Sequence, residues 1–266
     1  MWSLTTPQAG RVNAEAPGFQ SRYVMVTAAS YVAGIAFVTV VLEQDEAYET
    51  HMAYMFGYTD GTFRPDNAIT RAEAAALLVR TMVDDFHPTA PVPNIQGRFS
   101  DVPATEWFHR YVAWAYDADI IRGYPDGSFR PNNRVSREEV AAMVARLVDG
   151  GGTAGNMPFP DANQISPWAR NYVYTAYREG WMRGDAGGLF RPTDSLTRAE
   201  MVTIANRILD RDGTTAQSIQ NVRDDIRTFS DVQAHMWFFF EVVEASNSHR
   251  LTRNAAGLEI WVEILN

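Results

Sequence analysis

The sequence predicts a mainly α-helical domain built from three helix–loop–helix repeats and preceded by a short β-rich segment. Two observations predict this class. A nonapeptide recurs without gaps as GYTDGTFRP at 57–65, GYPDGSFRP at 123–131 and GDAGGLFRP at 184–192. A pentapeptide follows each copy, as ITRAE at 69–73, VSREE at 135–139 and LTRAE at 196–200. A repeat of this size cannot bury its own apolar faces, so the repeats must pack together.

The composition supports a folded domain and excludes several classes of function. The 266 residues are 46% hydrophobic and 12% aromatic, which suffices for a sizeable core and excludes disorder. There is no cysteine, so neither a disulfide framework nor a cysteine-ligated zinc site is expected. The net charge of −9 argues against a nucleic-acid partner, because such a partner needs a basic face. Any anion that the chain binds must be held by local groups.

Residues 1–50 are expected to be the β-rich remnant of an upstream domain. The first 22 residues lack the basic head, apolar run and cleavage site of a signal peptide. The stretch Tyr23–Leu42 carries no charge over twenty residues, which is long enough for a membrane span. Its density of Val, Thr, Ile, Tyr and Phe favours paired strands instead, with a membrane segment as the alternative.

Each pentapeptide is typical of a helix start. Ser or Thr followed three residues later by Glu forms a capping box, in which the two side chains satisfy two backbone N–H groups at the helix N-terminus. The predicted boxes are Thr70 with Glu73, Ser136 with Glu139, and Thr197 with Glu200. Another helix is predicted before the nonapeptide in the second and third repeats, where aromatic and small residues recur at helical spacing from Trp107 and from Trp168.

The predicted repeats differ in completeness. The first, at 51–88, lacks its first helix, whereas the second, at 99–150, and the third, at 159–210, have both helices. Residues 229–266 contain a first helix that no loop and second helix follow, and then a tail whose alternation predicts a strand. We expect this half repeat to take the place that is empty in the first repeat, and so to close a ring of three. The tail could pair with the apolar N-terminal segment.

The arginine of each pentapeptide has no role in starting a helix. Arg71, Arg137 and Arg198 fall at the first helical position, where the positive end of the helix dipole disfavours a cation by roughly 0.3–1 kcal/mol. A helix N-terminus favours an anion instead. A residue type placed there in every repeat needs another reason, either a negative ligand or an ion pair within the chain.

Together, the F-x-D segment, a Trp eight or nine residues later, G-Y-x-D-G-x-F-R-P and [IVL]-[TS]-R-[AE]-E resemble the S-layer homology repeat of bacterial cell-surface proteins. The resemblance covers about residues 51–210, with a half repeat from 229. It implies pseudo-threefold symmetry and grooves that bind secondary cell-wall polysaccharide attached to peptidoglycan, often carrying pyruvate ketals. It also implies an extracellular protein of the cell wall or S-layer that is anchored non-covalently, with ligand contacts at Arg71, Arg137 and Arg198.

The candidate glycan-binding residues combine cations, aromatic rings and loop carboxylates. A guanidinium fork suits a sugar carboxylate, and sugar faces stack on aromatic rings. The candidates are Arg71, Arg137, Arg198, Tyr58, Asp60, Tyr124, Asp126, Trp107, Trp168 and Trp237. Each type has a structural alternative: ion pairs for the arginines, turn formation for the aspartates, and core packing for the tryptophans, which their helical spacing favours. Three further arginines recur in register, for which we expect a solvated helix face or pairing between repeats: Arg80, Arg146 and Arg207.

The three sites are expected to be unequal. Asp185 replaces the loop tyrosine in the third repeat, and Gly187 replaces the loop aspartate. Glu138 stands beside Arg137, where it could neutralise the arginine and weaken that site.

Other classes of function find little support in the sequence. The five histidines form no HExxH motif, and no nucleophile elbow or spaced carboxylate pair appears, so no enzyme, catalytic residue or cofactor is predicted. The D-G loops lack the alternating oxygen ligands of an EF-hand, and no metal site is predicted. Self-association in a surface layer, without direct glycan binding, is the alternative function.

Overall fold

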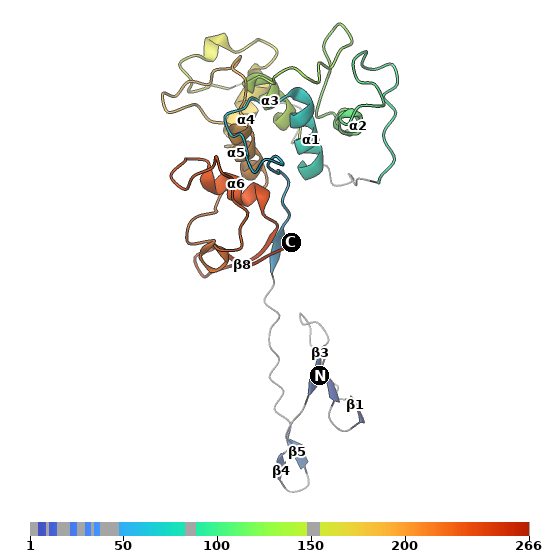
Figure 1. The fold of residues 1–266 in the computed structure, drawn as a ribbon, viewed down its shortest axis with the longest axis vertical. Helices are drawn as coiled ribbons and strands as arrows, with labels where there is room; N and C mark the ends of the chain where they lie inside the picture. The colour runs from blue at the N-terminus through green and yellow to red at the C-terminus, as the bar shows by residue number, and fades with distance from the viewer. Residues whose placement is uncertain are drawn as a thin grey trace. The chain divides into compact units, whose positions relative to one another are not determined.

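The computed structural model describes residues 48–82, 89–147 and 155–265, together with five short strands between residues 5 and 37 (Figure 1). The chain divides into two compact units, Met1–Glu49 and Thr50–Asn266. The first unit holds the short strands, and the second holds all the helices of the described residues. The prediction of a mainly α-helical class is confirmed.

The N-terminal unit is built from strands. β1 (Thr5–Gln8), β2 (Arg11–Ala14) and β3 (Arg22–Met25) form an antiparallel sheet in that order, and β4 (Ser30–Val32) pairs with β5 (Ile35–Phe37). The paired strands predicted within Tyr23–Leu42 are therefore present, while residues 26–29, 33–34 and 38–42 lie outside the described residues. Among the residues described, no helix is both long and apolar enough to cross a membrane.

Three helices of the second unit begin at the pentapeptides, as predicted. They are α1 (Arg71–Met82), α3 (Arg137–Ala145) and α5 (Arg198–Ile208). All three capping boxes form; the Glu139 carboxylate, for example, accepts a 2.9 Å hydrogen bond from the Ser136 N–H. The N-terminus of each helix is therefore set by its own sequence.

The other helices pack on these three in pairs. α2 (His109–Asp117) packs on α1, α4 (Arg170–Arg178) on α3, and α6 (Phe239–Ser246) on α5. Short 3-10 turns lie at Ala162–Gln164 and, as η2, at Gln220–Val222. One continuous apolar core joins all three pairs, with Phe63, Phe129 and Phe190 of the loops fully buried in it.

The repeats meet around a closed triangle of backbone hydrogen bonds. The Ile69 N–H donates to the Leu196 carbonyl, the Leu196 N–H to the Val135 carbonyl, and the Val135 N–H to the Ile69 carbonyl, at 2.9–3.0 Å. All three residues are buried. Because each bond joins a different pair of repeats, the triangle gives the domain its pseudo-threefold arrangement.

The half repeat contacts the loop of the first repeat as the other first segments contact theirs. The Asp231 carboxylate accepts hydrogen bonds from the Phe63 and Arg64 N–H groups, both at 2.7 Å. Arg64 has a φ of 57°, a left-handed conformation that is unfavourable for a residue with a side chain, so its loop needs such support. The equivalent contacts are Asp101 with Phe129 and Arg130, and Asp161 with Phe190 and Arg191.

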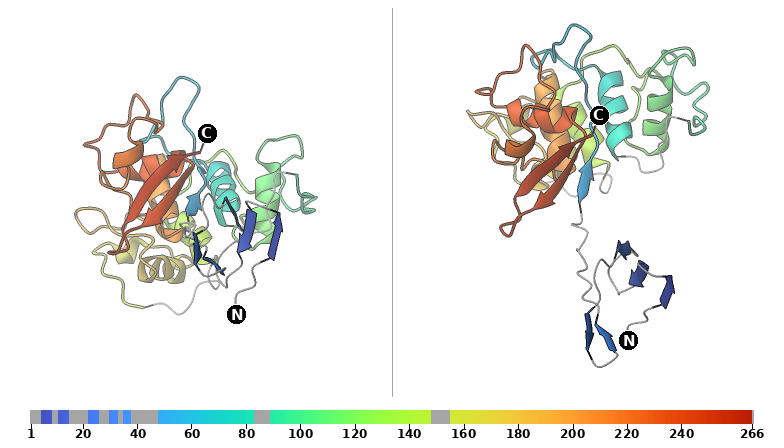
Figure 2. Two further views of the ribbon diagram at one scale, coloured as in Figure 1. Left: turned by 90° about the horizontal axis from the view of Figure 1, so that it is seen from below. Right: turned by 60° about the horizontal axis from the view of Figure 1, so that its bottom comes forward.

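A small sheet stands beside α6 and η2. It consists of β6 (Glu49–His51), β7 (His249–Arg253) and β8 (Glu259–Ile264) in that order, with β7 and β8 antiparallel (Figure 2). The tail therefore forms the predicted strand, and its partner is β7. A second apolar cluster around the fully buried Trp261 holds this sheet against the rest of the unit.

Candidate functional site

The pentapeptide arginines are buried and reach across repeat boundaries. Arg71 is 4% exposed; its Nε donates to the Phe129 carbonyl at 2.8 Å, and its Nη1 lies 2.8 Å from Oε1 of Glu139. Its guanidinium also stands 4.8 Å from the centre of the Tyr124 ring. The helix start of the first repeat is thereby bound to the loop and the capping glutamate of the second.

The same arrangement recurs at the other boundaries, with one difference. Arg137 donates to the Phe190 and Arg183 carbonyls and pairs with Glu200 at 3.0 Å. Arg198 donates to the Phe63 and Phe56 carbonyls at 2.9 and 3.1 Å, yet within the described part of the chain no carboxylate forms an ion pair with it. Burial lowers the pKa of Arg198, which shows how poorly water solvates this cation.

The helix N-termini are closed by neighbouring repeats. The Arg71 N–H donates to the Asn133 carbonyl and the Ala72 N–H to the Pro131 carbonyl, at 2.9 and 3.0 Å. α3 and α5 receive the equivalent carbonyls, from Asp194 and Pro192 and from Asn67 and Pro65. The first two amide hydrogens of each of these helices are therefore occupied by carbonyl oxygens and are not free to bind an anion.

The loop aspartates shape their turns. The Asp60 carboxylate accepts from the Thr62 N–H and hydroxyl and pairs with Arg64 at 2.8 Å. Asp126 makes the same contacts with Ser128 and Arg130. In the third repeat the Asp185 carboxylate accepts from the Gly187 and Leu189 N–H groups. Asp185 therefore shapes the loop of the third repeat as Asp60 shapes that of the first, although the two aspartates stand at different positions of the nonapeptide.

The loop tyrosines are half-buried between arginines. Tyr58 lies under the Arg64 guanidinium at 3.8 Å and near that of Arg198 at 5.0 Å. The Tyr124 hydroxyl donates to Glu139. Burial and this hydrogen bond raise the pKa of Tyr124 to about 12.

The structure corrects the expectation that the tryptophans belong to the core. Trp107, Trp168 and Trp237 are 56%, 52% and 65% exposed. The physical reason is position: α2 begins at His109, α4 at Arg170 and α6 at Phe239, so each tryptophan precedes its helix and does not lie on the helix face that the spacing assumed. In the described residues Phe108, Ala169 and Phe238, which follow the tryptophans, are buried instead.

Two of the exposed tryptophans, Trp237 and Trp107, line grooves between repeats. A groove of about 600 Å³ along α5 is lined by Trp237, Arg137, Arg183, Glu200 and Arg207, among others. A smaller groove of about 240 Å³ along α1 is lined by the equivalent residues Trp107, Arg198, Phe56, Glu73 and Arg80. The two grooves are thus built alike: each holds one Trp, one pentapeptide arginine (Arg137 or Arg198) and one arginine of the second recurring set (Arg207 or Arg80).

Two arginines of the second recurring set line these grooves, Arg207 along α5 and Arg80 along α1. Arg207 donates to the Trp181 carbonyl at 3.3 Å, and Arg146 to the equivalent Ile120 carbonyl at 3.2 Å. Arg80 is exposed and its guanidinium stands 5.1 Å from the Tyr111 ring centre. The expectation of a solvated helix face therefore fits the exposed Arg80. It does not fit Arg146 and Arg207, which are half-buried.

Glu138 does not neutralise Arg137. It is buried, and its carboxylate accepts hydrogen bonds from the Ser166 N–H at 3.0 Å and the Ser166 hydroxyl at 2.7 Å. Ser166 stands two residues before Trp168. The expectation of a weakened arginine is wrong, because the side chain turns to the segment that carries the tryptophan.

Three segments of the chain, 52–75, 98–141 and 158–202, match the S-layer homology domain. The chain is 28% identical over 221 residues to a cellulosome-anchoring protein of Acetivibrio thermocellus, which covers 81% of this chain and 47% of that protein. It is 34% identical to an amylopullulanase of Thermoanaerobacterium thermosulfurigenes, over 59% of this chain and 8% of the enzyme. A surface layer protein of Brevibacillus choshinensis is 38% identical over 35% of this chain and 8% of its own length. The chain thus spans less than half the length of these relatives. Its repeats between residues 52 and 202 belong to the S-layer homology domain family.

Proposed function

We propose that this chain anchors a surface protein non-covalently to the bacterial cell wall by binding an acidic secondary wall polysaccharide in its grooves. One observation carries the proposal: an exposed tryptophan and a set of arginines share each of the two described grooves. A tryptophan ring offers a flat face on which a sugar stacks, and a guanidinium binds a carboxylate such as that of a pyruvate ketal.

The arginines divide into structural and available ones. Arg137 is already paired with Glu200 and donates to two backbone carbonyls, so its role in the lining of the α5 groove is structural. Arg183 in the same groove is exposed, and within the described residues no carboxylate pairs with it. In the α1 groove the exposed Arg80 and the buried Arg198, with which no carboxylate forms an ion pair in the described residues, supply positive charge. Glu73 and Asp231 act on Arg198 only through longer-range electrostatics, and an acidic ligand would supply the direct carboxylate contact.

The names of the relatives agree with an anchoring role. One relative is named a cellulosome-anchoring protein and others are surface layer proteins. Relatives named as enzymes are matched over only 8% and 14% of their length, which supports a non-catalytic module that is carried beside a separate enzyme. With a net charge of −9, long-range steering of an anionic polymer is unfavourable, so the grooves select by local geometry. The implied location is the cell surface.

The test is co-sedimentation of the purified chain with Gram-positive wall sacculi, before and after acid removal of the attached polysaccharide. The Trp107→Ala/Trp237→Ala double variant should lose most of the pelleted fraction, because both side chains are exposed and carry little of the fold. Leu258→Ala is its control, because Leu258 is an apolar residue outside the grooves that is 48% exposed. Equal pelleting of wild type and double variant, or equal pelleting on stripped sacculi, would defeat the proposal.

A charge variant tests the ligand's acidity. Arg183→Gln should weaken pelleting, while Arg223→Gln, an exposed arginine outside both grooves, should not.

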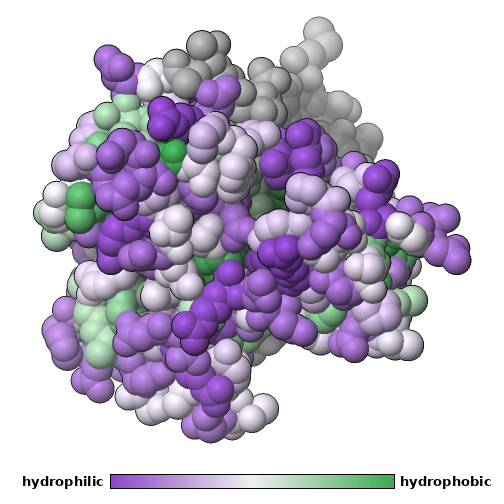
Figure 3. Space-filling model, turned by 90° about the horizontal axis from the view of Figure 1, so that it is seen from above, coloured by the Kyte–Doolittle hydropathy of each residue, from purple (hydrophilic) through white to green (hydrophobic). Residues whose placement is uncertain are grey.

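The alternative function, self-association, is measured in the same samples by analytical ultracentrifugation. The face shown in Figure 3 is mostly hydrophilic, with hydrophobic residues in small separate patches. Loss of oligomers together with unchanged wall binding in these variants would support an assembly module instead.

A further inference from the structure

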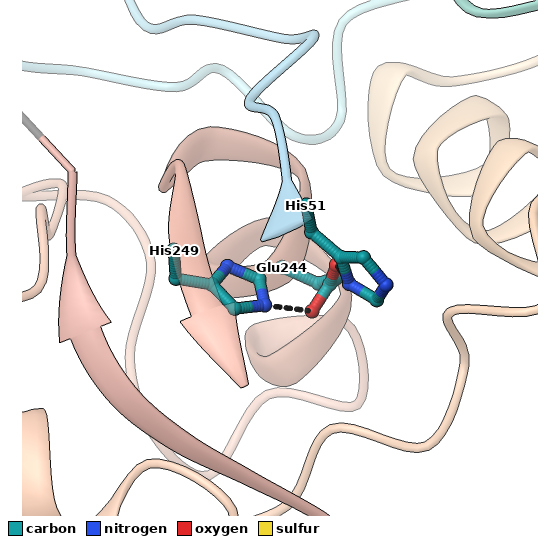
Figure 4. Close-up of side chains that lie close together, drawn as sticks. All are labelled: His51, Glu244 and His249. Carbon is teal, nitrogen blue, oxygen red and sulfur yellow. Dashed lines mark hydrogen bonds and ion pairs between the residues drawn. The ribbon is translucent and has the colours of Figure 1, made fainter. Parts of the chain in front are cut away.

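Two histidines and a glutamate meet in the interior, away from the grooves. His51 comes from β6, Glu244 from α6 and His249 from β7, and Figure 4 shows the three side chains turned toward one another. They are 8%, 1% and 0% exposed. The Nδ1 of His51 lies 2.8 Å from Glu244 Oε1, and the Nε2 of His249 lies 3.6 Å from Glu244 Oε2. One ligand atom from each residue lies within 4.8 Å of the other two.

The Nε2 atom of His249 carries a lone pair that faces the Glu244 carboxylate. Its Nδ1 lies 2.9 Å from the Asn247 carbonyl oxygen, and because a carbonyl only accepts, Nδ1 must carry the hydrogen. The neutral ring then has a lone pair on Nε2, which is buried and has no hydrogen-bond partner in the described part of the chain. Glu244 Oε2, which Nε2 faces, already accepts from the Thr214 hydroxyl at 2.8 Å. Two electron-pair donors thus face each other without a hydrogen between them.

Two polar side chains near this gap already have other partners. Arg211 and Tyr54 stand near the cluster, but Arg211 donates to the Met52 carbonyl and the Tyr54 hydroxyl to Asn206, so neither occupies the gap. The His249 ring is also stacked on the buried Trp261 at 3.4 Å, which fixes its orientation.

We infer that His51, Glu244 and His249 bind one divalent transition-metal ion of the zinc class. Two imidazole nitrogens and one carboxylate are a common ligand set for Zn²⁺, with bonds of roughly 2.0–2.2 Å, which bring tetrahedral ligand atoms to about 3.3 Å from one another. The 3.6 Å separation between His249 and Glu244 is close to this value, whereas His51 and Glu244, at 2.8 Å, would move apart and atoms up to 4.8 Å apart would move inward. The carbonyl of Asn247 on His249 and the hydroxyl of Thr214 on Glu244 are the outer partners that orient metal ligands.

Such an ion would fasten the first strand of this unit to the half repeat. The segment that follows β6 is also held there: the Ala53 N–H donates to the Ser248 hydroxyl, and the Tyr54 and Met55 N–H groups donate to the Ala245 carbonyl. The position of Glu244 corresponds to Trp114 and Thr175 in the complete repeats, so the carboxylate is special to the half repeat.

The decisive experiment uses the full chain, stripped with a chelator and then titrated with ZnCl₂ and, separately, CoCl₂. We expect one ion per chain, an upward shift of the melting temperature with Zn²⁺, and the visible absorption of tetrahedral Co²⁺. Absence of stoichiometric binding and of the Co²⁺ spectrum in the wild-type chain would overturn the inference without recourse to any variant.

Variants locate the site. His51→Ala and His249→Phe, of which the second keeps a ring against Trp261, should lose the bound ion and the melting shift, with folding checked by circular dichroism. His235→Ala, an exposed histidine elsewhere, should keep both. Thr214→Val, which alters only an orienting partner, should weaken affinity about 10–100-fold. Retention of one tight ion in both ligand variants would contradict the assignment.

Discussion

The Nη1 of Arg71 lies 2.8 Å from Oε1 of Glu139, so the capping glutamate of one repeat holds the arginine of another. Arg137 and Glu200 repeat this relationship at 3.0 Å, whereas Arg198 has no such partner in the described residues. The pentapeptide therefore starts a helix and joins two repeats. Because these arginines are buried between repeats, substituting them should affect the fold, whereas the exposed Trp107 and Trp237 can be substituted to test binding.

Replacing the paired arginines should destabilise the domain more than replacing the unpaired one. Arg71→Ala leaves Glu139 without its cation and should cost about 3 kcal/mol, the low end for breaking a buried pair, because the carboxylate is partly exposed. Arg198→Ala leaves no carboxylate stranded and should cost less. Urea unfolding of both variants checks the order, and an equal loss would show that the ion pair contributes little.

The half repeat should be necessary for the stability of the first repeat. Asp231→Ala removes the acceptor of two backbone N–H groups and should cost about 1–3 kcal/mol, similar to Asp101→Ala, which removes the equivalent acceptor within the second repeat. Deletion of residues 229–266 should destabilise the whole domain. The measurement is the melting temperature, and an unchanged value after the deletion would refute the closed ring.

The turn aspartates should add stability that depends on pH. The hydroxyl and N–H of Thr62 and the Arg64 guanidinium lower the pKa of Asp60 from 3.8 to about 2. Since the folded-state pKa is the lower one, the contribution is complete above pH 3.8 and disappears as the pH falls toward 2. Carboxyl NMR titration should find this pKa in the wild type. A value near 3.8 in the folded chain would mean that the turn contacts are not held in solution.

Glu138 should fix the segment that carries Trp168. Glu138→Ala removes both acceptors of Ser166 and should cost about 1–3 kcal/mol, with a change in Trp168 fluorescence in a chain whose other tryptophans are replaced. Glu106→Ala, at an exposed glutamate, serves as the control and should leave the stability unchanged. Should the two variants unfold at the same denaturant concentration as the wild type, the buried carboxylate would have no structural role.

The sequence was sufficient to predict features that depend on short spacing. The capping boxes at Thr70, Ser136 and Thr197 involve residues three apart, and each formed as expected. The spacing wrongly predicts that the tryptophans pack in the core, because it treats them as helical residues whereas each one precedes its helix. The cluster of His51, Glu244 and His249 escaped the sequence pattern for another reason: His51 and Glu244 are 193 residues apart and meet only when the half repeat docks.

The most direct test of the central claim is calorimetric titration of the full chain with wall polysaccharide released from peptidoglycan, compared with the same polymer after its carboxylates are reduced to alcohols. The account predicts saturable binding of the acidic polymer, much weaker binding of the reduced polymer, and loss of both in the Trp107→Ala/Trp237→Ala variant. Absence of binding to the acidic polymer, or equal binding of wild type and variant, would contradict it.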